Sequence, residues 1–251
     1  MTGAPILSSR NVGKSFGAFS AVSAVDLDVM PGETLGLIGP NGAGKTTFFN
    51  MLTGFVLPDN GSVLYLEQDI THLPVEQRVA RGLVRTFQKS LIFPGLSIRE
   101  NVALAVRAQN KTGYRWWRSA ASLREADELA ASLIERSGLA RRGGELACNV
   151  SHGEQRIVDV LLAIALQPRL LLLDEPTAGL ARAEADQVLN MIRHHDLRTA
   201  VLMIAHDLDI VFSVCDRIAV LNLGRLIAVD SPEAIRINPE VRTAYLGELA
   251  T

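Results

Sequence analysis

The residues best suited to chemistry form one continuous stretch, Gly39-Pro40-Asn41-Gly42-Ala43-Gly44-Lys45-Thr46, with Thr47 directly behind it. This stretch fits the spacing Gly-x-x-x-x-Gly-Lys-Ser/Thr, which is typical of phosphate-binding loops. Glycines let the backbone wrap closely around oxygen atoms, so that backbone N–H groups face the phosphates. The Lys45 ammonium can supply a full charge to the β and γ phosphates, and the Thr46 hydroxyl can ligate Mg²⁺.

The segments on either side of this loop predict the context that a phosphate site needs. An apolar run, Leu35–Ile38, leads in and predicts a strand, and Lys45–Thr53 leads out and predicts a helix that Gly54 ends. The positive end of that helix would then face the phosphates. A glycine-rich turn before a helix is the alternative without function. The motif predicts that the chain binds a nucleoside triphosphate, and it does not say for what purpose.

A second pair of candidate residues follows four consecutive leucines at 170–173, which predict a strand buried on both faces. Asp174 and Glu175 stand at its carboxyl end. Buried charges there need a cation or hydrogen-bond partners, and Mg²⁺ on a triphosphate is the natural one. Asp174 is expected to hold Mg²⁺ through water, which leaves Glu175 to orient or deprotonate the attacking water. An acidic loop at a strand end is the weaker alternative.

Two further polar residues stand at the ends of expected strands. His206 follows the apolar run Ala200–Ala205, and Gln88 follows Leu83–Phe87. Open α/β sheets bind ligands outside the carboxyl ends of their strands, so both side chains are candidates for the ligand crevice. His206 could hydrogen-bond a γ-phosphate there. Taken singly, a structural histidine and an ordinary loop glutamine are the plainer interpretations.

Ser151 and Glu154 have the spacing of a capping box, which predicts a helix whose start includes Gly153. Helix starts bind phosphate, so this segment is a candidate for a second anion site, although a simple capped helix is the plainer interpretation. Phe16, in the loop between two expected strands, could stack on a purine ring. An aromatic side chain buried in the core is the alternative.

The rest of the chain predicts an α/β protein with a helical insertion. Antiparallel strands are expected before the phosphate loop, at Ile6–Val12 and around Val25–Val29, and again as a hairpin around Asn222–Arg225. Residues 93–149 show only helical patterns. A capping box at Ser122–Glu125 predicts the start of one helix there, and Gly138 predicts its end.

Composition narrows the function classes. The 251 residues carry a net charge of −2, so nothing indicates a nucleic-acid partner. The first residues lack the plan of a signal peptide, and no apolar run has the length of a membrane span. The two cysteines, Cys148 and Cys215, indicate a reducing compartment and no metal site built from thiols. A cytoplasmic protein is expected.

Taken together, these motifs resemble the ATP-binding cassette of ABC transporters over essentially the whole chain. The resemblance implies a RecA-like P-loop NTPase core with an N-terminal antiparallel β subdomain and an inserted helical subdomain. Within one domain of 1–251, residues 1–88 and 150–251 would form the nucleotide-binding core and residues 89–149 the helical subdomain. ATP and Mg²⁺ are the implied cofactors, and ATP hydrolysis is the implied reaction.

The resemblance also implies roles for individual residues. Lys45, Glu175 and His206 would take part in hydrolysis, and Thr46, Gln88 and Asp174 would surround Mg²⁺. The residues implied to contact ATP are Phe16, Gly39, Pro40, Asn41, Gly42, Ala43, Gly44, Lys45, Thr46, Thr47, Gln88, Ser151, Gly153 and Gln155.

The implied partners follow from the same family. Two transmembrane permease subunits, a second ABC ATPase subunit and, indirectly, a substrate-binding protein would assemble with this chain. That second subunit would be either a copy of this chain or a non-identical ATPase. The chain would then lie on the cytoplasmic side of the membrane as a peripheral subunit.

Several stretches look like the ATPase subunits of importers for branched-chain, or hydrophobic, amino acids. They are Thr86-Phe87-Gln88, Phe93-Pro94-Gly95-Leu96, Phe49–Gly54 and Ala244–Glu248. The ATPase of lipopolysaccharide export is the second choice, and a soluble ABC-type ATP switch is the third. Two residues depart from the family pattern. His152 replaces a glycine of the signature segment, and Ala181 stands where an acidic or amide residue usually helps to couple the two halves of the dimer.

Overall fold

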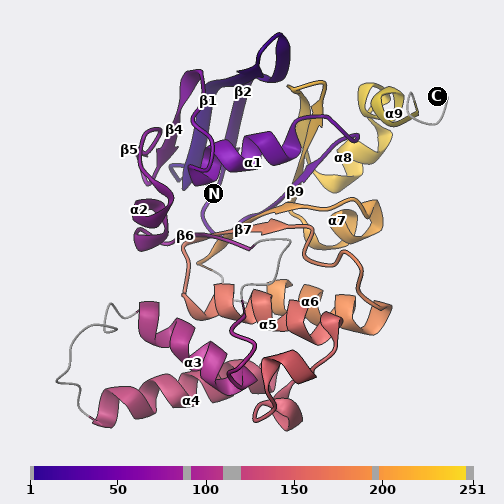
Figure 1. Ribbon diagram of the computed structural model, residues 1–251. Coiled ribbons are helices and arrows are strands. Elements are labelled where there is room, and N and C mark those ends of the chain that lie inside the picture. Colours follow the sequence, from indigo (N-terminus) through magenta and orange to yellow (C-terminus); the bar gives the residue numbers. More distant parts are fainter. Residues whose placement is uncertain (1–2, 87–91, 110–119, 194–197, 247–251) are drawn as a thin grey trace. The chain divides into compact units, whose positions relative to one another are not determined.

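The computed structural model describes residues 3–86, 92–109, 120–193 and 198–246 (Figure 1). Contacts divide the chain into two compact units. The first, called here the sheet unit, comprises Met1–Val84, Arg169–Glu175 and Leu197–Thr251. The second, called the helical unit, comprises Arg85–Pro168 and Pro176–Asp196.

The sheet unit begins with a four-stranded antiparallel sheet in the order β2-β1-β4-β5. Its strands are β1 (Leu7–Phe16), β2 (Phe19–Val29), β4 (Asn60–Tyr65) and β5 (Gln68–Asp69). The inner residues of β2 alternate with exposed ones, which is the pattern of a strand with one buried and one wet face. The expected antiparallel start of the chain is therefore confirmed.

A six-stranded sheet in the order β10-β9-β3-β8-β7-β6 forms the other layer of the sheet unit. Its strands are β3 (Thr34–Ile38), β6 (Leu83–Arg85), β7 (Leu170–Asp174), β8 (Ala200–Ile204), β9 (Arg217–Asn222) and β10 (Arg225–Asp230). β3 pairs in parallel with β8 and β9, and β8 pairs in parallel with β7. The carboxyl ends of β3, β8 and β7 therefore meet at one edge of the sheet.

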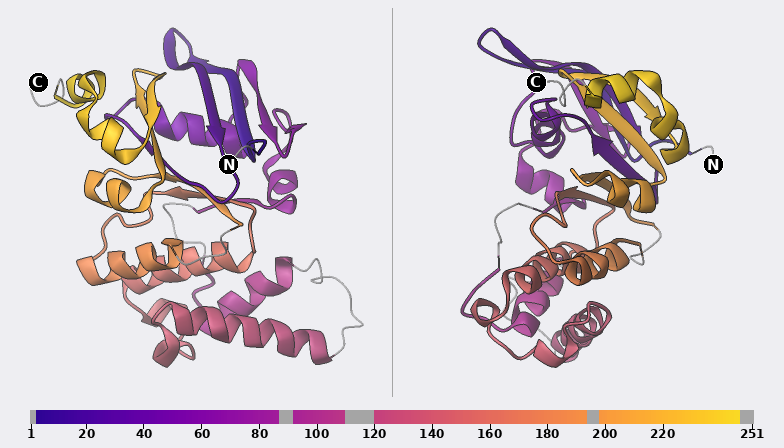
Figure 2. Two further views of the ribbon diagram at one scale, coloured as in Figure 1. Left: turned by 180° about the vertical axis from the view of Figure 1, so that it is seen from behind. Right: turned by 90° about the vertical axis from the view of Figure 1, so that its right-hand side faces the viewer.

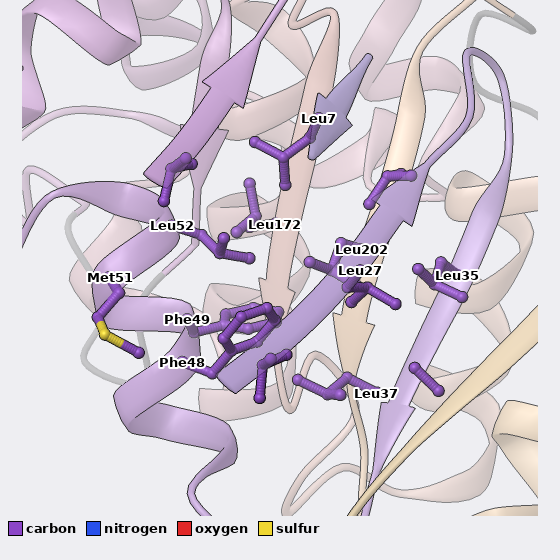
Figure 3. Close-up of a cluster of buried hydrophobic side chains, with 14 of the residues drawn as sticks. Leu7, Leu27, Leu35, Leu37, Phe48, Phe49, Met51, Leu52, Leu172 and Leu202 are labelled. Carbon is purple, nitrogen blue, oxygen red and sulfur yellow. The ribbon is translucent and has the colours of Figure 1, made fainter. Parts of the chain in front are cut away.

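Helix α1 (Lys45–Thr53) packs its apolar side chains into the main core of the sheet unit. Figure 3 shows Phe48 and Phe49 of α1 beside leucines from both sheets, including Leu27 and Leu202. Each of these buried rings and leucines contributes about 1.5–3 kcal/mol relative to exposure, which fixes the helix on the sheets. The other helices of this unit are α2 (Val75–Ala80), α7 (Leu208–Val214), α8 (Pro232–Ile237) and α9 (Pro239–Leu246).

The helical unit consists of α3 (Ile98–Gln109), α4 (Ala120–Arg136), α5 (His152–Ala165) and α6 (Arg182–Arg193). Two short 3-10 turns, Ala140–Arg142 and Ala147–Asn149, connect α4 to α5. The views in Figure 2 show α3 beside α4 and α5 beside α6. No helix in the described ranges is long and apolar enough to cross a membrane.

Most expected elements are confirmed, including the helix over Lys45–Thr53 and its end at Gly54, which adopts a left-handed φ of 85°. The expected helix start at Ser122–Glu125 is wrong, because α4 already includes Ala120 and Ser122 lies inside it. The alanines before Ser122 are strong helix formers and continue the helix past the capping pattern. Contacts group α5 with the helical unit, and the expected division into a core and a helical subdomain at 89–149 stays a prediction.

Candidate functional site

The loop that leads from β3 into α1 has a backbone that only glycine allows at two positions. Gly39 has a φ of 153° and Gly44 a φ of 98°. A Cβ at Gly39 would lie 2.1 Å from the Leu221 carbonyl oxygen, and one at Gly44 would lie 2.3 Å from the Ala21 carbonyl oxygen. The loop is therefore held between backbone segments of β9 and β2, and no side chain fits at either position.

The first turn of α1 is arranged to meet an anion. No side chain caps the helix at Gly44, and its first turn contains no acidic residue, so neither competes for the positive helix end. The Lys45 side chain is only 7% exposed and folds over the loop. Its ammonium donates to the carbonyls of Gly39 at 2.6 Å and Pro40 at 2.8 Å. Thr46 beside it is exposed.

Two acidic residues and a histidine meet at the carboxyl ends of β7 and β8. Asp174 pairs with Ile204 across the two strands and is 4% exposed. Glu175 adopts a left-handed φ of 50°, and its N–H donates to the Ile204 carbonyl at 2.9 Å. His206 Nε2 lies 2.5 Å from Glu175 Oε1. Glu175 thus combines a backbone conformation that is uncommon for a non-glycine residue with a close contact to His206, and such conformations cluster at active sites.

The chemistry of this edge fits a magnesium-bound nucleoside triphosphate. Mg²⁺ prefers oxygen ligands and usually takes one or two from the protein, with the remainder from phosphates and water. Asp174 offers a buried carboxylate and Thr46 an exposed hydroxyl. No cluster of three or more His, Cys, Asp or Glu side chains suited to a metal occurs in the described ranges.

Phe16 lies at the end of β1, opposite Phe19 at the start of β2. Its side chain is 53% exposed, so the alternative of a core aromatic is wrong. The Lys14 ammonium lies 5.8 Å from the centre of the Phe16 ring and is ion-paired with Asp59 at 2.6 Å. Hydrogen bonds from Lys14 and from the Ser15 backbone lower the pKa of Asp59. The ring is available for stacking, and its contact with a purine stays a prediction.

In the helical unit, the expected capping box at the start of α5 is confirmed. The Ser151 hydroxyl accepts from the Glu154 N–H at 3.1 Å, and the Ser151 N–H donates to Glu154 Oε2 at 2.8 Å. The Arg142 guanidinium also donates to both carboxylate oxygens of Glu154. Burial raises the pKa of Glu154, but the Ser151 and Arg142 hydrogen bonds outweigh it and hold the pKa below its usual value.

The sequence did not predict that Glu184 lies at this helix start. Glu184 Oε2 accepts from the Ala181 N–H at 3.0 Å, and Oε1 lies 3.5 Å from the Ser151 hydroxyl. A Cβ on Gly153 would lie 2.1–2.2 Å from the carboxylate atoms of Glu184. The only sequence signal was the three-residue spacing from Ala181 to Glu184, half of a capping box that lacks the serine or threonine.

Two more of the predicted contact residues have different outcomes. The Gln155 amide nitrogen donates to the carbonyls of Ala147 at 3.2 Å and Val150 at 3.3 Å, which holds the turn before α5. Gln88 lies outside the described residues.

The structure thus brings Lys45, Asp174, Glu175 and His206 to the same edge of one sheet. It places Ser151, Gly153 and Gln155 together in the other unit.

Two family models and several known proteins match this chain. Residues 22–178 match the family model for ABC transporters, and residues 225–250 match that for branched-chain amino acid ATP-binding cassette transporters. The chain is 41% identical to the high-affinity branched-chain amino acid transport ATP-binding protein LivG of Escherichia coli strain K12, covering 97% of this chain and 98% of LivG. It is 38% identical to the high-affinity branched-chain amino acid transport ATP-binding protein BraF of Pseudomonas aeruginosa, covering 97% of this chain and 98% of BraF.

A solved structure shows the same fold. The ADP conformation of MJ1267, an ATP-binding cassette of an ABC transporter, superposes with a TM-score of 0.82 at 28% identity. The match covers 98% of this chain and 100% of that one, so the expected ABC ATPase fold is confirmed. With a family model that spans most of the chain and relatives that match end to end, this chain belongs to the ABC transporter family, as an ATP-hydrolysing subunit.

Proposed function

We propose that this chain binds and hydrolyses Mg²⁺–ATP to energise a membrane importer for branched-chain or other hydrophobic amino acids. One observation carries the chemical part of the proposal. Asp174 ends β7 and Glu175 follows it, His206 follows β8, and the loop that leaves the neighbouring parallel strand β3 leads to Lys45. A phosphate-binding loop and a pair of carboxylates at one sheet edge are what phosphoryl transfer to water requires.

Each residue at this edge has a distinct part in hydrolysis. The Lys45 ammonium leaves the Gly39 and Pro40 carbonyls to bind the β and γ phosphates, joined by N–H groups at the start of α1. Glu175 orients the attacking water and takes up its proton. His206, whose Nε2 lies 2.5 Å from Glu175 Oε1, holds the carboxylate in place and would donate a hydrogen bond to the γ-phosphate.

Asp174 and the Thr46 hydroxyl would hold Mg²⁺, with Gln88 as a further ligand. When bound, Mg²⁺ neutralises charge on the phosphate oxygens during the transfer. Phe16 would stack on the adenine ring from the exposed end of β1. The other contacts to the phosphates come from the backbone of residues 39–47.

The start of α5 would serve ATP bound to a second ATPase subunit. In this family two cassettes face each other head to tail, and a helix start with Ser151 and Gly153 suits the γ-phosphate held by the opposite subunit. That subunit is a copy of this chain or a non-identical ATPase. Two transmembrane permease subunits would receive the energy, the substrate-binding protein would act on them from the other side, and this chain would stay peripheral on the cytoplasmic face.

The cargo follows from relatives and not from the site, because an ATPase subunit does not contact the transported molecule. The match of residues 225–250 to the branched-chain model, together with LivG and BraF over nearly the full length, supports amino acid import. Neither a lipopolysaccharide exporter nor a soluble ATP switch is favoured by these matches.

The test uses the protein in its own membrane. Tagged protein purified in mild detergent is expected to bring along two permease subunits, and uptake of labelled leucine should be lost in cells that carry only K45A. The K45A subunit should still co-purify with the permease, which separates lost chemistry from lost assembly. Co-purification with lipid-export subunits, or leucine uptake that does not depend on Lys45, would contradict the proposal.

A further inference from the structure

Arg78, in the middle of α2, is a buried cation whose hydrogen-bond partners are all backbone carbonyls. Its side chain is 0% exposed. Nε donates to Leu73 O at 2.9 Å, Nη1 to Met51 O at 2.9 Å and Leu52 O at 2.7 Å, and Nη2 to Thr71 O at 2.9 Å. Burial lowers the pKa of Arg78 to about 10, which leaves it charged at neutral pH.

Two of those carbonyls belong to the last turn of the helix that begins with Lys45. The last carbonyls of a helix have no partner within it and carry partial negative charge, so a cation there stabilises the whole helix. Gly54, which ends α1, leaves room for the guanidinium. A Cβ at Gly54 would lie 2.7 Å from Arg78 Nε, and its φ is 85°. The nine residues of α1 put this contact about 13 Å behind the phosphate end.

The other two carbonyls, those of Thr71 and Leu73, belong to the turn between β5 and α2. The Thr71 hydroxyl accepts from the Val63 N–H of β4 at 2.9 Å, which fastens this turn to the antiparallel sheet. The planar fork of Arg78 therefore spans from the end of α1 to that sheet. A lysine cannot reproduce this, because it offers a single nitrogen instead of three at fixed angles.

We propose that Arg78 is a positioning residue for the nucleotide site: by anchoring the C-terminal end of α1 to the β5–α2 turn, it sets where the first turn of α1 presents its N–H groups and Lys45 to the phosphates. This inference rests on the proposed ATP site at the start of α1. It assigns no contact between Arg78 and the nucleotide. Its consequence is that nucleotide affinity depends on a side chain at the far end of the helix.

The test compares R78K with R217K, each measured as full-length protein. Arg217 lies in the same unit and donates to Glu33 at 2.9 Å, and it pairs with Leu35 near the start of β3, at the opposite end of that strand from the phosphate loop. R78K is expected to weaken binding of a fluorescent ADP analogue about tenfold, and R217K less than about twofold. In the assembled transporter, R78K should raise the KM for ATP with a smaller effect on kcat.

A purely structural role for Arg78 would lower the melting temperature of R78K without changing its ADP affinity well below that temperature. An affinity within twofold of the unmodified protein would therefore overturn the inference. If the unmodified protein and R217K bound no ADP, the proposed function itself would fail, and the inference with it. The two failures are thus distinguishable.

If R78K does not fold, hydrogen exchange on the unmodified protein tests the coupling between Arg78 and the nucleotide site. ADP is expected to slow exchange at residues 39–48 and also at 52–56 and 71–78, because the Arg78 contacts couple these segments. The amides of 215–220, in the same unit, serve as the internal comparison. Protection that stops at residue 48 would overturn the inference.

Discussion

Two helix starts in this protein, those of α1 and α5, are each suited to phosphate but are built in opposite ways. α1 begins at a glycine, with no side-chain cap and no acid in its first turn. α5 begins with a full capping box, and a second carboxylate, that of Glu184, lies against Gly153. The start of α1 therefore has neither a side-chain cap nor an acidic residue in its first turn, whereas the start of α5 has two carboxylates beside it.

Because of this difference, the two helix starts would bind a phosphate in different ways. A phosphate arriving at α1 finds the loop backbone held in place between Leu221 and Ala21. A phosphate arriving at α5 has to displace the carboxylate of Glu184 or bind beside it. A phosphate site at α1 would be preformed, and one at α5 would exchange an internal anion for an external one.

Adding one methyl group at each helix start should have very different effects. In G44A the new Cβ would meet the Ala21 carbonyl, a backbone atom that cannot move away, at a φ of 98°. In G153A it would meet the carboxylate of Glu184, the far end of a flexible side chain. We expect G44A to lose about 1–3 kcal/mol of unfolding free energy and most ATP binding. G153A should change stability by less than about 1 kcal/mol.

Chemical denaturation and nucleotide titration measure both variants. G144A, where a Cβ would meet nothing within 4 Å, serves as the control. If G153A destabilised the protein as much as G44A, the Glu184 carboxylate would not be displaceable and the contrast would be wrong.

Removing the charge of Glu184 should strengthen the binding of phosphate at the start of α5. E184Q keeps an oxygen that can accept from Ala181 N–H, but it removes the negative charge beside α5. In an E175Q background, ATP-driven dimer formation should strengthen by about two- to fivefold in E184Q. The measurement is the ATP concentration at half-maximal dimer in size-exclusion chromatography.

Glu100 supplies a matched control for that experiment. It forms the capping box of α3 with Ser97, at 2.7 Å from the Ser97 N–H, in the same unit. E100Q, in the same E175Q background, should leave the ATP concentration at half-maximal dimer formation unchanged. Equal behaviour of E184Q and E100Q would show that Glu184 is only a helix cap.

Acid should loosen the start of α5 and not that of α1. The folded-state pKa of Glu154 lies below its unfolded value of 4.5. The ionised carboxylate therefore stabilises the folded state fully above pH 4.5, and this stabilisation is lost as the pH falls through the lower folded-state pKa. Between pH 5 and pH 3, hydrogen-exchange protection should fall at residues 152–156 more than at residues 45–49. E154Q should remove that difference, and a uniform loss at both helices would contradict the assignment.

Structural features that depend on a few neighbouring residues could be predicted from the sequence. The helix over Lys45–Thr53, the strand over the four leucines and the capping box at Ser151 all depend on neighbours within a few residues. The capping pattern at Ser122 failed because the same residues also fit a helix interior, and the alanines before them decided the outcome. Local sequence patterns therefore predict which segments form helices and strands more reliably than they predict where those segments begin and end.

Contacts between distant segments could not be predicted. Arg78 donates to carbonyls of residues 26 and 27 positions earlier, and Glu184 lies against a serine 33 positions earlier. Nothing in the spacing of single residues shows such pairs, because backbone carbonyls carry no sequence signal. The exposure of Phe16 was also left open, since an aromatic residue between two strands can turn either way.

We propose that Glu175, held by His206 at the sheet edge, activates the water that hydrolyses an ATP bound at the start of α1. The most direct measurement is ATP turnover and ATP-dependent dimer formation by E175Q beside the unmodified protein. We predict that E175Q binds ATP with affinity close to normal, loses turnover by at least about a hundredfold and accumulates as a dimer. Normal turnover by E175Q would contradict the account.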